Sequence, residues 1–379
     1  MLDELRIRSS PHIDLKAPAD LAPEQWAPFR ELADDPDFYG FFVPRAPLAM
    51  NLMSVGRETA ELFQKLSTPS RLDVSNGEFR DGLIDLVLDG VFEIESGDDF
   101  VCGADALPVL CDPPEEPAAL DAVGRLSREA LLYAQDLAAG DFATQSMALY
   151  FYNRVPLSPF WKKRFPDAGA VLAHLGADRG LLATLLDRHW AISHRSSGWI
   201  AWNSKIAFRK GKDDVTYKLY VSPRPERMRE AFEIVVRVLS GFPETPFKIG
   251  HDAVGLLRPD KMVAYFTNRE TLDEVAALLS RELSGCDAHG VPFTAGLDDS
   301  GLLSWGVDPP DSDVALHWRG RESWRLWVAK RLGAAMAMAR ASRTSTGIEP
   351  WRFALARARR HGIDTNTWAP SATLWSSSQ

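Results

Sequence analysis

Apolar residues recur at helical spacing in two early segments of the chain and then alternate in a third. Residues 57–66 show the spacing of an amphipathic helix. Residues 79–89 repeat it and stop at Gly90, a residue type that commonly ends helices. Residues 91–101 alternate around a Gly-Asp turn, which is typical of two short strands. The pattern predicts two helices followed by a small hairpin, as in a winged helix.

The second half of the chain combines both kinds of spacing. Several short helices are predicted between residues 118 and 200. After them, helices alternate with strands that are rich in β-branched and aromatic residues. The expected strands are 200–209, 215–221, 246–250 and 261–266, and the expected helices are 225–239 and 271–283. We therefore predict the α+β class, with an N-terminal winged-helix-like unit, a helical middle and a C-terminal mixed α+β domain.

Four segments are expected from these patterns. A proline-rich stretch at 111–117 is the clearest linker, because proline does not continue a helix or a central strand. The expected segments are an N-terminal arm (1–40), a winged-helix-like domain (41–113), a helical segment (118–200) and an α+β domain (201–379).

Composition narrows the class of protein. Of 379 residues, 45% are apolar and 25% are charged, which is close to the average for globular proteins. No window approaches the roughly 18–20 uninterrupted apolar residues of a membrane span, and no signal-peptide pattern opens the chain. Three scattered cysteines fit neither a disulfide framework nor a zinc site. We expect a cytoplasmic protein that binds neither a membrane nor a metal.

Charge is distributed unevenly along the chain. Residues 1–120 carry 24 acidic and nine basic side chains, whereas residues 319–361 carry 11 basic and two acidic ones. Basic clusters attract phosphate-bearing ligands, although opposite charges could equally hold two domains together. Phosphate contacts dominate DNA affinity, so the acidic winged-helix-like unit is not expected to bind nucleic acid.

That small unit is similar to the peptide-recognition domains of enzymes that modify ribosomally made peptides. Such domains bind a leader peptide by adding it as a strand at a sheet edge. A structural wing that only packs on the rest of the chain is the alternative.

Basic residues lie in or beside the predicted strands of the C-terminal domain. Lysine is almost never buried without a partner, yet Lys218 and Lys248 stand within apolar strands. Arg258 and Lys261 follow at the start of the next strand. Together these four residues predict a convergent cationic pocket. Separate, solvent-exposed edge strands are the alternative.

Three strand sequences carry a resemblance to a known family. Residues 217–222, 247–249 and 262–266 occur in the order of three core strands of the phosphothreonine lyases injected by bacterial pathogens. The region from about residue 205 onward also resembles the Hop-type effector-like phospho-Ser/Thr lyases of class V lanthipeptide and thioamitide biosynthesis. The resemblance implies β-elimination of phosphate from a phosphorylated ribosomal precursor peptide, without a metal or organic cofactor. It also implies a partner kinase and a cyclase.

The resemblance assigns roles by position. Lys248 matches the lysine base that removes the α-proton, and Lys218 and Arg258 match residues that contact the phosphate. Lys261 adds a further cation to the predicted pocket, and Arg325 is a candidate for another phosphate contact. Desolvation and neighbouring cations lower the pKa of a lysine, so one cluster can both hold phosphate and prepare the base.

The proton donor is where the chain departs from the family. The effector lyases carry a histidine two residues after the strand lysine, and this chain has Tyr220 there. Tyr220 or His251 is then the donor, or phosphate leaves without one. The loss of the histidine favours an alternative function, a non-catalytic peptide-binding subunit that supports a partner kinase or cyclase.

Overall fold

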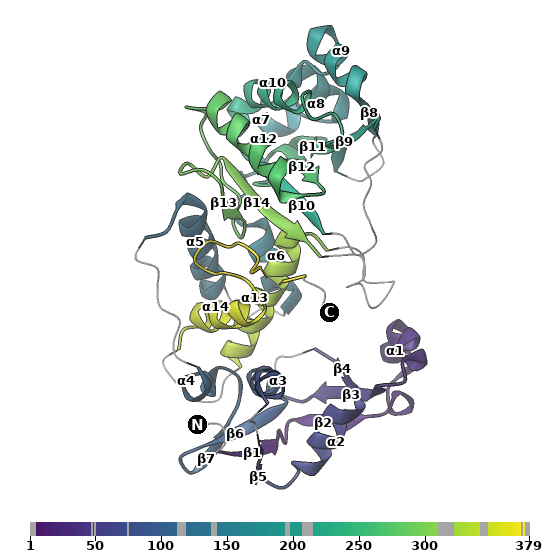
Figure 1. Cartoon of the computed structure of the whole chain (residues 1–379), viewed down its shortest axis with the longest axis vertical. Helices are drawn as coiled ribbons and strands as arrows, with labels where there is room; N and C mark the ends of the chain where they lie inside the picture. Colours follow the sequence, from purple (N-terminus) through teal and green to yellow (C-terminus); the bar gives the residue numbers. More distant parts are fainter. Residues whose placement is uncertain are drawn as a thin grey trace.

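The computed structural model describes residues 5–46, 48, 51–73, 76–111, 119–137, 142–193, 198–206, 215–309, 322–341, 348–372 and 374–375. Figure 1 shows three parts along the long axis: small sheets near the N-terminus, a group of helices in the middle, and a large sheet with its helices at the other end. Both helices and sheets contribute substantially, so the predicted α+β class is confirmed.

The N-terminal part contains two antiparallel sheets, with strand orders β5-β1-β6-β7 and β2-β3-β4. The two helices and the hairpin predicted from the sequence are present. Gly90, just after the second of these helices, has a positive φ of 79°. The elements are β1 (Arg6–Ser9), β2 (Ile13–Lys16), α1 (Pro23–Trp26), β3 (Phe38–Pro44), β4 (Met53–Gly56), α2 (Arg57–Lys65), β5 (Ser70–Arg71), α3 (Gly77–Leu88), β6 (Phe92–Ser96), β7 (Asp99–Val101) and α4 (Leu107–Leu110).

The segment expected to be an arm is paired into these sheets instead. Strand β1 pairs with β5 and β6, and β2 pairs with β3. The reason is that its short apolar patches are buried: Ile7 and Ile13 are almost fully removed from water. Strands of four residues give too little alternation for sequence periodicity to detect.

A seven-stranded antiparallel sheet forms the other end of the molecule, with the order β13-β14-β10-β12-β11-β9-β8. The predicted strands at 215–221, 246–250 and 261–266 are confirmed to within a residue. The strands are β8 (Trp190–Ser193), β9 (Trp199–Ser204), β10 (Thr216–Val221), β11 (Phe247–Gly250), β12 (Met262–Phe266), β13 (Ala295–Gly296) and β14 (Leu303–Asp308).

Helices cover one face of this sheet and build a core with it. Apolar residues of α10 and α12 pack there with the alternate side chains of the central strands, such as Leu219, Phe247 and Ala264. Figure 1 shows these helices at the end of the molecule remote from the small sheets. The helices are α7 (Pro159–Arg164), α8 (Ala168–Leu175), α9 (Gly180–His189), α10 (Met228–Leu239), α11 (Ala253–Leu256) and α12 (Arg269–Glu282).

Four further helices lie between the large sheet and the N-terminal part. They are α5 (Ala122–Asp136), α6 (Phe142–Phe151), α13 (Trp324–Arg340) and α14 (Pro350–Arg360). Helix α13 packs against α6 and α14, so the expected helical middle associates with the last helices of the expected C-terminal domain. One hydrophobic cluster extends from the N-terminal sheets through these helices. In the described part of the chain, no helix is both long and apolar enough to cross a bilayer.

Ion pairs also join α14 to the N-terminal part. Arg357 is 3% exposed and contacts Asp85 of α3 and Asp89 at the C-terminal end of that helix, each at 2.6 Å. Arg360 contacts Asp85 as well, at 2.7 Å. The acidic front and the basic back of the chain therefore meet directly at this contact.

Candidate active site

Strand register places both strand lysines on the face of the large sheet that α10 and α12 leave uncovered. Lys218 on β10 lies opposite Tyr265 of β12 and Gly306 of β14. Lys248 on β11 lies opposite Val263, two residues before Tyr265 on the same strand. Because side chains alternate between the faces of a sheet, Lys218, Lys248 and Tyr265 share one face.

Lys218 is buried against a carboxylate. Only 6% of the residue is exposed, and its ammonium group pairs with Asp308 of β14. The same ammonium lies 5.4 Å from the centre of the Tyr265 ring. Asp308 is fixed in turn by the backbone N–H of Trp324, which donates to it at 2.8 Å at the start of α13. This partner explains why the sheet tolerates a lysine within an apolar strand.

Lys248 has aromatic neighbours in place of a carboxylate. Its Nζ lies 4.2 Å from the centre of the Trp199 ring and 5.5 Å from that of Tyr265. Among the described residues, no carboxylate lies within ion-pair distance of this nitrogen. Burial, followed by the charge of Lys218, lowers the pKa of Lys248 from 10.5 to about 8. A fraction of this amine is therefore unprotonated and basic at neutral pH.

Arg258 is held at the edge of the same site by a buried carboxylate. Its guanidinium donates to both oxygens of Asp260, at 2.8 and 2.9 Å, and to the hydroxyl of Tyr150 on α6, at 2.7 Å. The guanidinium also lies 5.0 Å from the centre of the Trp199 ring. Trp199 thus contacts both Lys248 and Arg258, and it links the two cations across the face of the sheet.

Arg325 holds Asp260 from the opposite side. It is 1% exposed, its Nη1 lies 3.0 Å from Asp260, and it donates to the carbonyls of Pro292 and Tyr150. Burial disfavours the charge on Asp260, but the two arginines more than offset this and hold its pKa below its usual range. With its donors turned inward, Arg325 supports the site through Asp260.

Lys261 is held by partners of its own. It is fully buried, and its Nζ donates to the carbonyl of Pro223 at 3.0 Å and lies 2.6 Å from Nδ1 of His289. Burial lowers its pKa to about 7. Its partners come from the loops that follow β10 and precede β13, so Lys261 ties these loops together.

The two candidate proton donors differ in position. Tyr220 shares the face of Lys218 and is 2% exposed, and its hydroxyl has no hydrogen-bond partner among the described residues. Burial raises the pKa of Tyr220 well above its usual value, so the phenol keeps its proton. His251 lies just beyond β11, where its ring is 3.4 Å from Asp252 and its backbone N–H donates to Gly198.

Sequence reasoning missed the residues that complete the site. Tyr150, Trp199 and Asp308 come from separate elements, and Asp260 was visible only as a neighbour of Arg258 in the sequence. Aromatic residues in the strands were the one local signal. It is a weak signal, because ordinary strand cores use the same residue types. The described residues contain no group of three or more potential metal ligands.

Comparisons with known proteins give distant structural similarities. No family model and no curated protein matches the chain. The effector protein from Pseudomonas syringae pv. tomato strain DC3000 is 14% identical with a TM-score of 0.42, covering 66% of this chain and 98% of its own. The effector protein from Pseudomonas syringae pv. syringae strain 61 is 12% identical with a TM-score of 0.38 and the same coverage. A phosphothreonine lyase is 12% identical with a TM-score of 0.25, covering 59% of this chain and 99% of its own. Similarity this distant carries no argument about activity, which must be judged from the site.

Proposed function

We propose that the protein is a phospho-Ser/Thr lyase that β-eliminates phosphate from a phosphorylated peptide. Lys248 takes the α-proton of the phosphorylated residue, a carbon–carbon double bond forms, and the bond from the β-carbon to the phosphate oxygen breaks. The products are a dehydroamino acid and inorganic phosphate. No oxidant, reductant or cofactor is needed to balance this reaction.

The observation that carries the proposal is the lowered pKa of Lys248, which is buried among aromatic rings without a carboxylate partner among the described residues. Its pKa near 8 allows it to accept a proton, whereas an ordinary lysine is fully charged at neutral pH. Lys218 lowers this pKa further and, with Arg258, provides positive charge for a phosphate group of about −1.5 to −2. The site therefore combines a base with cations that can stabilise the leaving group.

The protonated phenol of Tyr220 supports a role in the departure of phosphate. It shares the face of Lys218, and it has an unused hydroxyl in a buried position. In this proposal Tyr220 donates a proton to the leaving oxygen. His251 is the second candidate, and cations alone are the third route, since phosphate is a fair leaving group once its charge is neutralised.

We further propose that the substrate is a ribosomal precursor peptide of the lanthipeptide type, processed in the cytoplasm. A partner kinase would phosphorylate it and a cyclase would act on the product. In this scheme the N-terminal sheets bind the leader peptide along an exposed edge, because such edges offer unpaired backbone groups. The sequence resemblance supports this part of the proposal.

One observation favours a second function, that of a non-catalytic peptide-binding subunit. Lys218 and Arg258 are each paired with a carboxylate, which reduces the charge available to a leaving phosphate. Such a subunit would bind a phosphopeptide and release it unchanged.

Substitution of Lys248 separates these functions. Lys248→Ala should lower elimination by at least the ~10²–10⁴-fold that general-base catalysis typically contributes, while phosphopeptide affinity changes little. Lys248→Arg keeps the charge but does not deprotonate in a protein, so it should be equally inactive. Product analysis by mass spectrometry and affinity by titration calorimetry measure both. Substantial elimination by Lys248→Arg would exclude Lys248 as the base, and binding without turnover in the wild type would favour the second function.

A further inference from the structure

A short segment after α6 is fixed against the loop that carries Arg258. Asn153 adopts a left-handed backbone with a φ of 64°, and its side chain donates to the carbonyls of His289 and Gly290. Two residues later, the N–H of Val155 donates to the carbonyl of Leu257 at 3.0 Å. A non-glycine residue in this conformation is uncommon and needs such support from its surroundings. The segment is therefore held in place on both sides of Arg154.

Arg154 precedes Val155, whose backbone bond to Leu257 places this segment beside the loop that carries Arg258. The Nη2 of Arg154 donates to the carbonyl of Val254 at 2.8 Å, so one nitrogen of the guanidinium is fixed on α11. Burial and the positive charge of Arg258 lower the pKa of Arg154, whereas the carboxylates of Asp252 and Asp260 raise it. Among the described residues, no carboxylate lies within ion-pair distance of Arg154.

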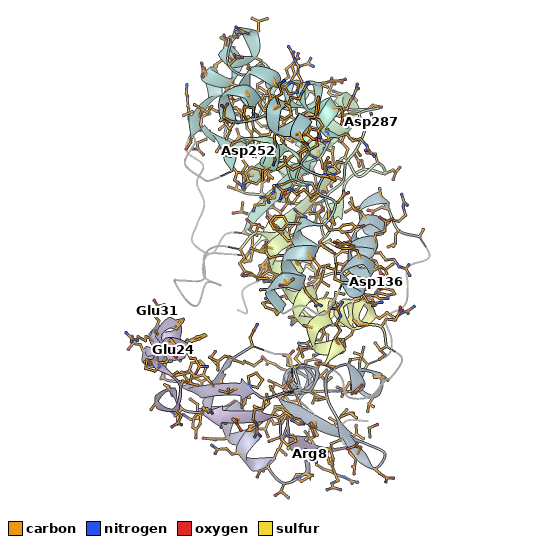
Figure 2. All side chains as sticks on the ribbon, turned by 180° about the vertical axis from the view of Figure 1, so that it is seen from behind. Arg8, Glu24, Glu31, Asp136, Asp252 and Asp287 are labelled. Carbon is orange, nitrogen blue, oxygen red and sulfur yellow. The ribbon has the colours of Figure 1, made fainter. Side chains whose placement is uncertain are left out.

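The nearby carboxylates are already engaged. Asp252 accepts the N–H of Gly255 at 2.8 Å as the cap of α11, and its other oxygen faces His251. Figure 2 labels Asp252 in the part of the molecule built on the large sheet, far from the acidic Glu24 and Glu31 near the N-terminus. Asp260 is bound by two arginines. Arg154 thus has no ion pair of its own among the described residues, and the carboxylates that act on its pKa are engaged by other groups.

We propose that Arg154 binds an anionic side chain of the substrate peptide, close in sequence to the phosphorylated residue. This proposal rests on the proposed function, because it assumes that the phosphate of the peptide binds at Arg258 and Lys218. Partial burial of a guanidinium without an ion-paired carboxylate costs free energy, and an anion from the substrate reduces that cost. Guanidinium also binds carboxylate and phosphate through two parallel hydrogen bonds.

The surface around Arg154 suits a peptide with such a side chain. Phe151 and Val254 flank it and are 39% and 44% exposed, so apolar contact is available beside the charge. Helix α7 contacts α11 and carries three basic residues in its last turn, which adds positive potential on this side. The anionic group is either a carboxylate or a second phosphate, and both share the chemistry that a guanidinium recognises.

Binding of designed phosphopeptides tests this assignment. A neutral phosphothreonine peptide is compared with variants that carry one Glu, or one phosphoserine, at each position from three before to three after the phosphothreonine. Full-length protein with Lys248→Ala is used so that the complex persists, and dissociation constants are measured by fluorescence anisotropy. A partly exposed ion pair typically changes affinity about two- to five-fold. At least one position should therefore bind several-fold more tightly than the neutral peptide.

The preference must depend on Arg154. Adding Arg154→Gln should abolish the gain from the added anion while affinity for the neutral peptide changes less. Arg179→Gln is the matched control, because its side chain is 88% exposed at the start of α9 and the substitution removes the same charge. It should preserve the preference. An equal gain in Arg154→Gln, or no gain at any position, overturns the assignment; the larger of the Glu and phosphoserine effects identifies the preferred anion.

The test is separate from that of the proposed function. An Arg154-dependent preference without elimination by the wild type would refute the lyase and keep the binding role. Elimination without any preference would refute the binding role alone.

Discussion

The charge of Lys218 should set the pH at which the protein works. If Lys248 is the base, kcat/KM for elimination should rise with pH and level off above about 8, the pKa of this amine. Lys218→Met removes the positive charge that, after burial, is the largest cause of the lowered pKa of Lys248. It also frees the carboxylate of Asp308, which then favours the charged form of Lys248.

The size of the effect follows from elementary electrostatics. The Nζ atoms of Lys218 and Lys248 lie 5.4 and 5.5 Å from the centre of the Tyr265 ring, so they are at most about 11 Å apart. With an effective dielectric constant of about 20, two like charges at about this distance repel by on the order of 1–2 kcal/mol. This corresponds to a shift of about one pH unit. The midpoint of the pH–rate profile should therefore move from about 8 to about 9 in Lys218→Met. At neutral pH the unprotonated fraction of Lys248 should fall about tenfold, in addition to any loss of phosphate affinity.

A continuous assay of phosphate release across pH 6 to 10 measures the midpoint independently of the maximal rate. Lys218→Arg is the control, because it keeps the charge and should keep the midpoint near 8. A midpoint that stays unchanged or falls in Lys218→Met would refute the coupling between the two lysines. A profile without any rise through pH 8 in the wild type would refute the base itself.

Three further substitutions test buried charges in the site and at the contact of α14 with the N-terminal part. Asp260→Asn removes the carboxylate shared by two arginines, and disrupting a buried pair typically costs about 3–5 kcal/mol, so urea unfolding should show a large loss of stability. Because burial lowers the pKa of Lys261 from 10.5 to about 7, the unfolded chain binds more protons and stability should rise as pH increases through that window. Lys261→Met should flatten this rise, and an unaltered slope would contradict the lowered pKa. Arg357→Met leaves two aspartates of α3 without their shared partner and should destabilise the protein by about 2–4 kcal/mol; a change within about 0.5 kcal/mol would show that the contact with α14 is dispensable.

Local patterns were enough to locate the central strands and their two faces. Residues 216–221 and 262–266 are strands because β-branched and aromatic residues alternate there, and the same alternation places Lys218 and Tyr220 on the face opposite Leu219. The first forty residues were harder, because their paired strands are short and separated by turns.

The partners within the site depend on contacts between distant parts of the chain. Arg258 meets Tyr150 from α6 and Asp260 from its own loop, and Asp260 meets Arg325 from α13. Nothing in local periodicity relates these elements, since their association follows from the packing of α6 against α13. Lys261 is only three residues from Arg258 in the sequence, but its own partners, Pro223 and His289, again come from distant loops.

The most direct test of the lyase is the mass of the peptide that the protein releases. A phosphothreonine peptide incubated with the wild-type protein should yield inorganic phosphate and a peptide that has lost phosphoric acid, and the new double bond should add a thiol. Lys248→Ala, treated identically, should return the phosphopeptide intact. Recovery of the plain threonine peptide would show hydrolysis instead of elimination, and recovery of the phosphopeptide from the wild type would contradict the catalytic role of this site.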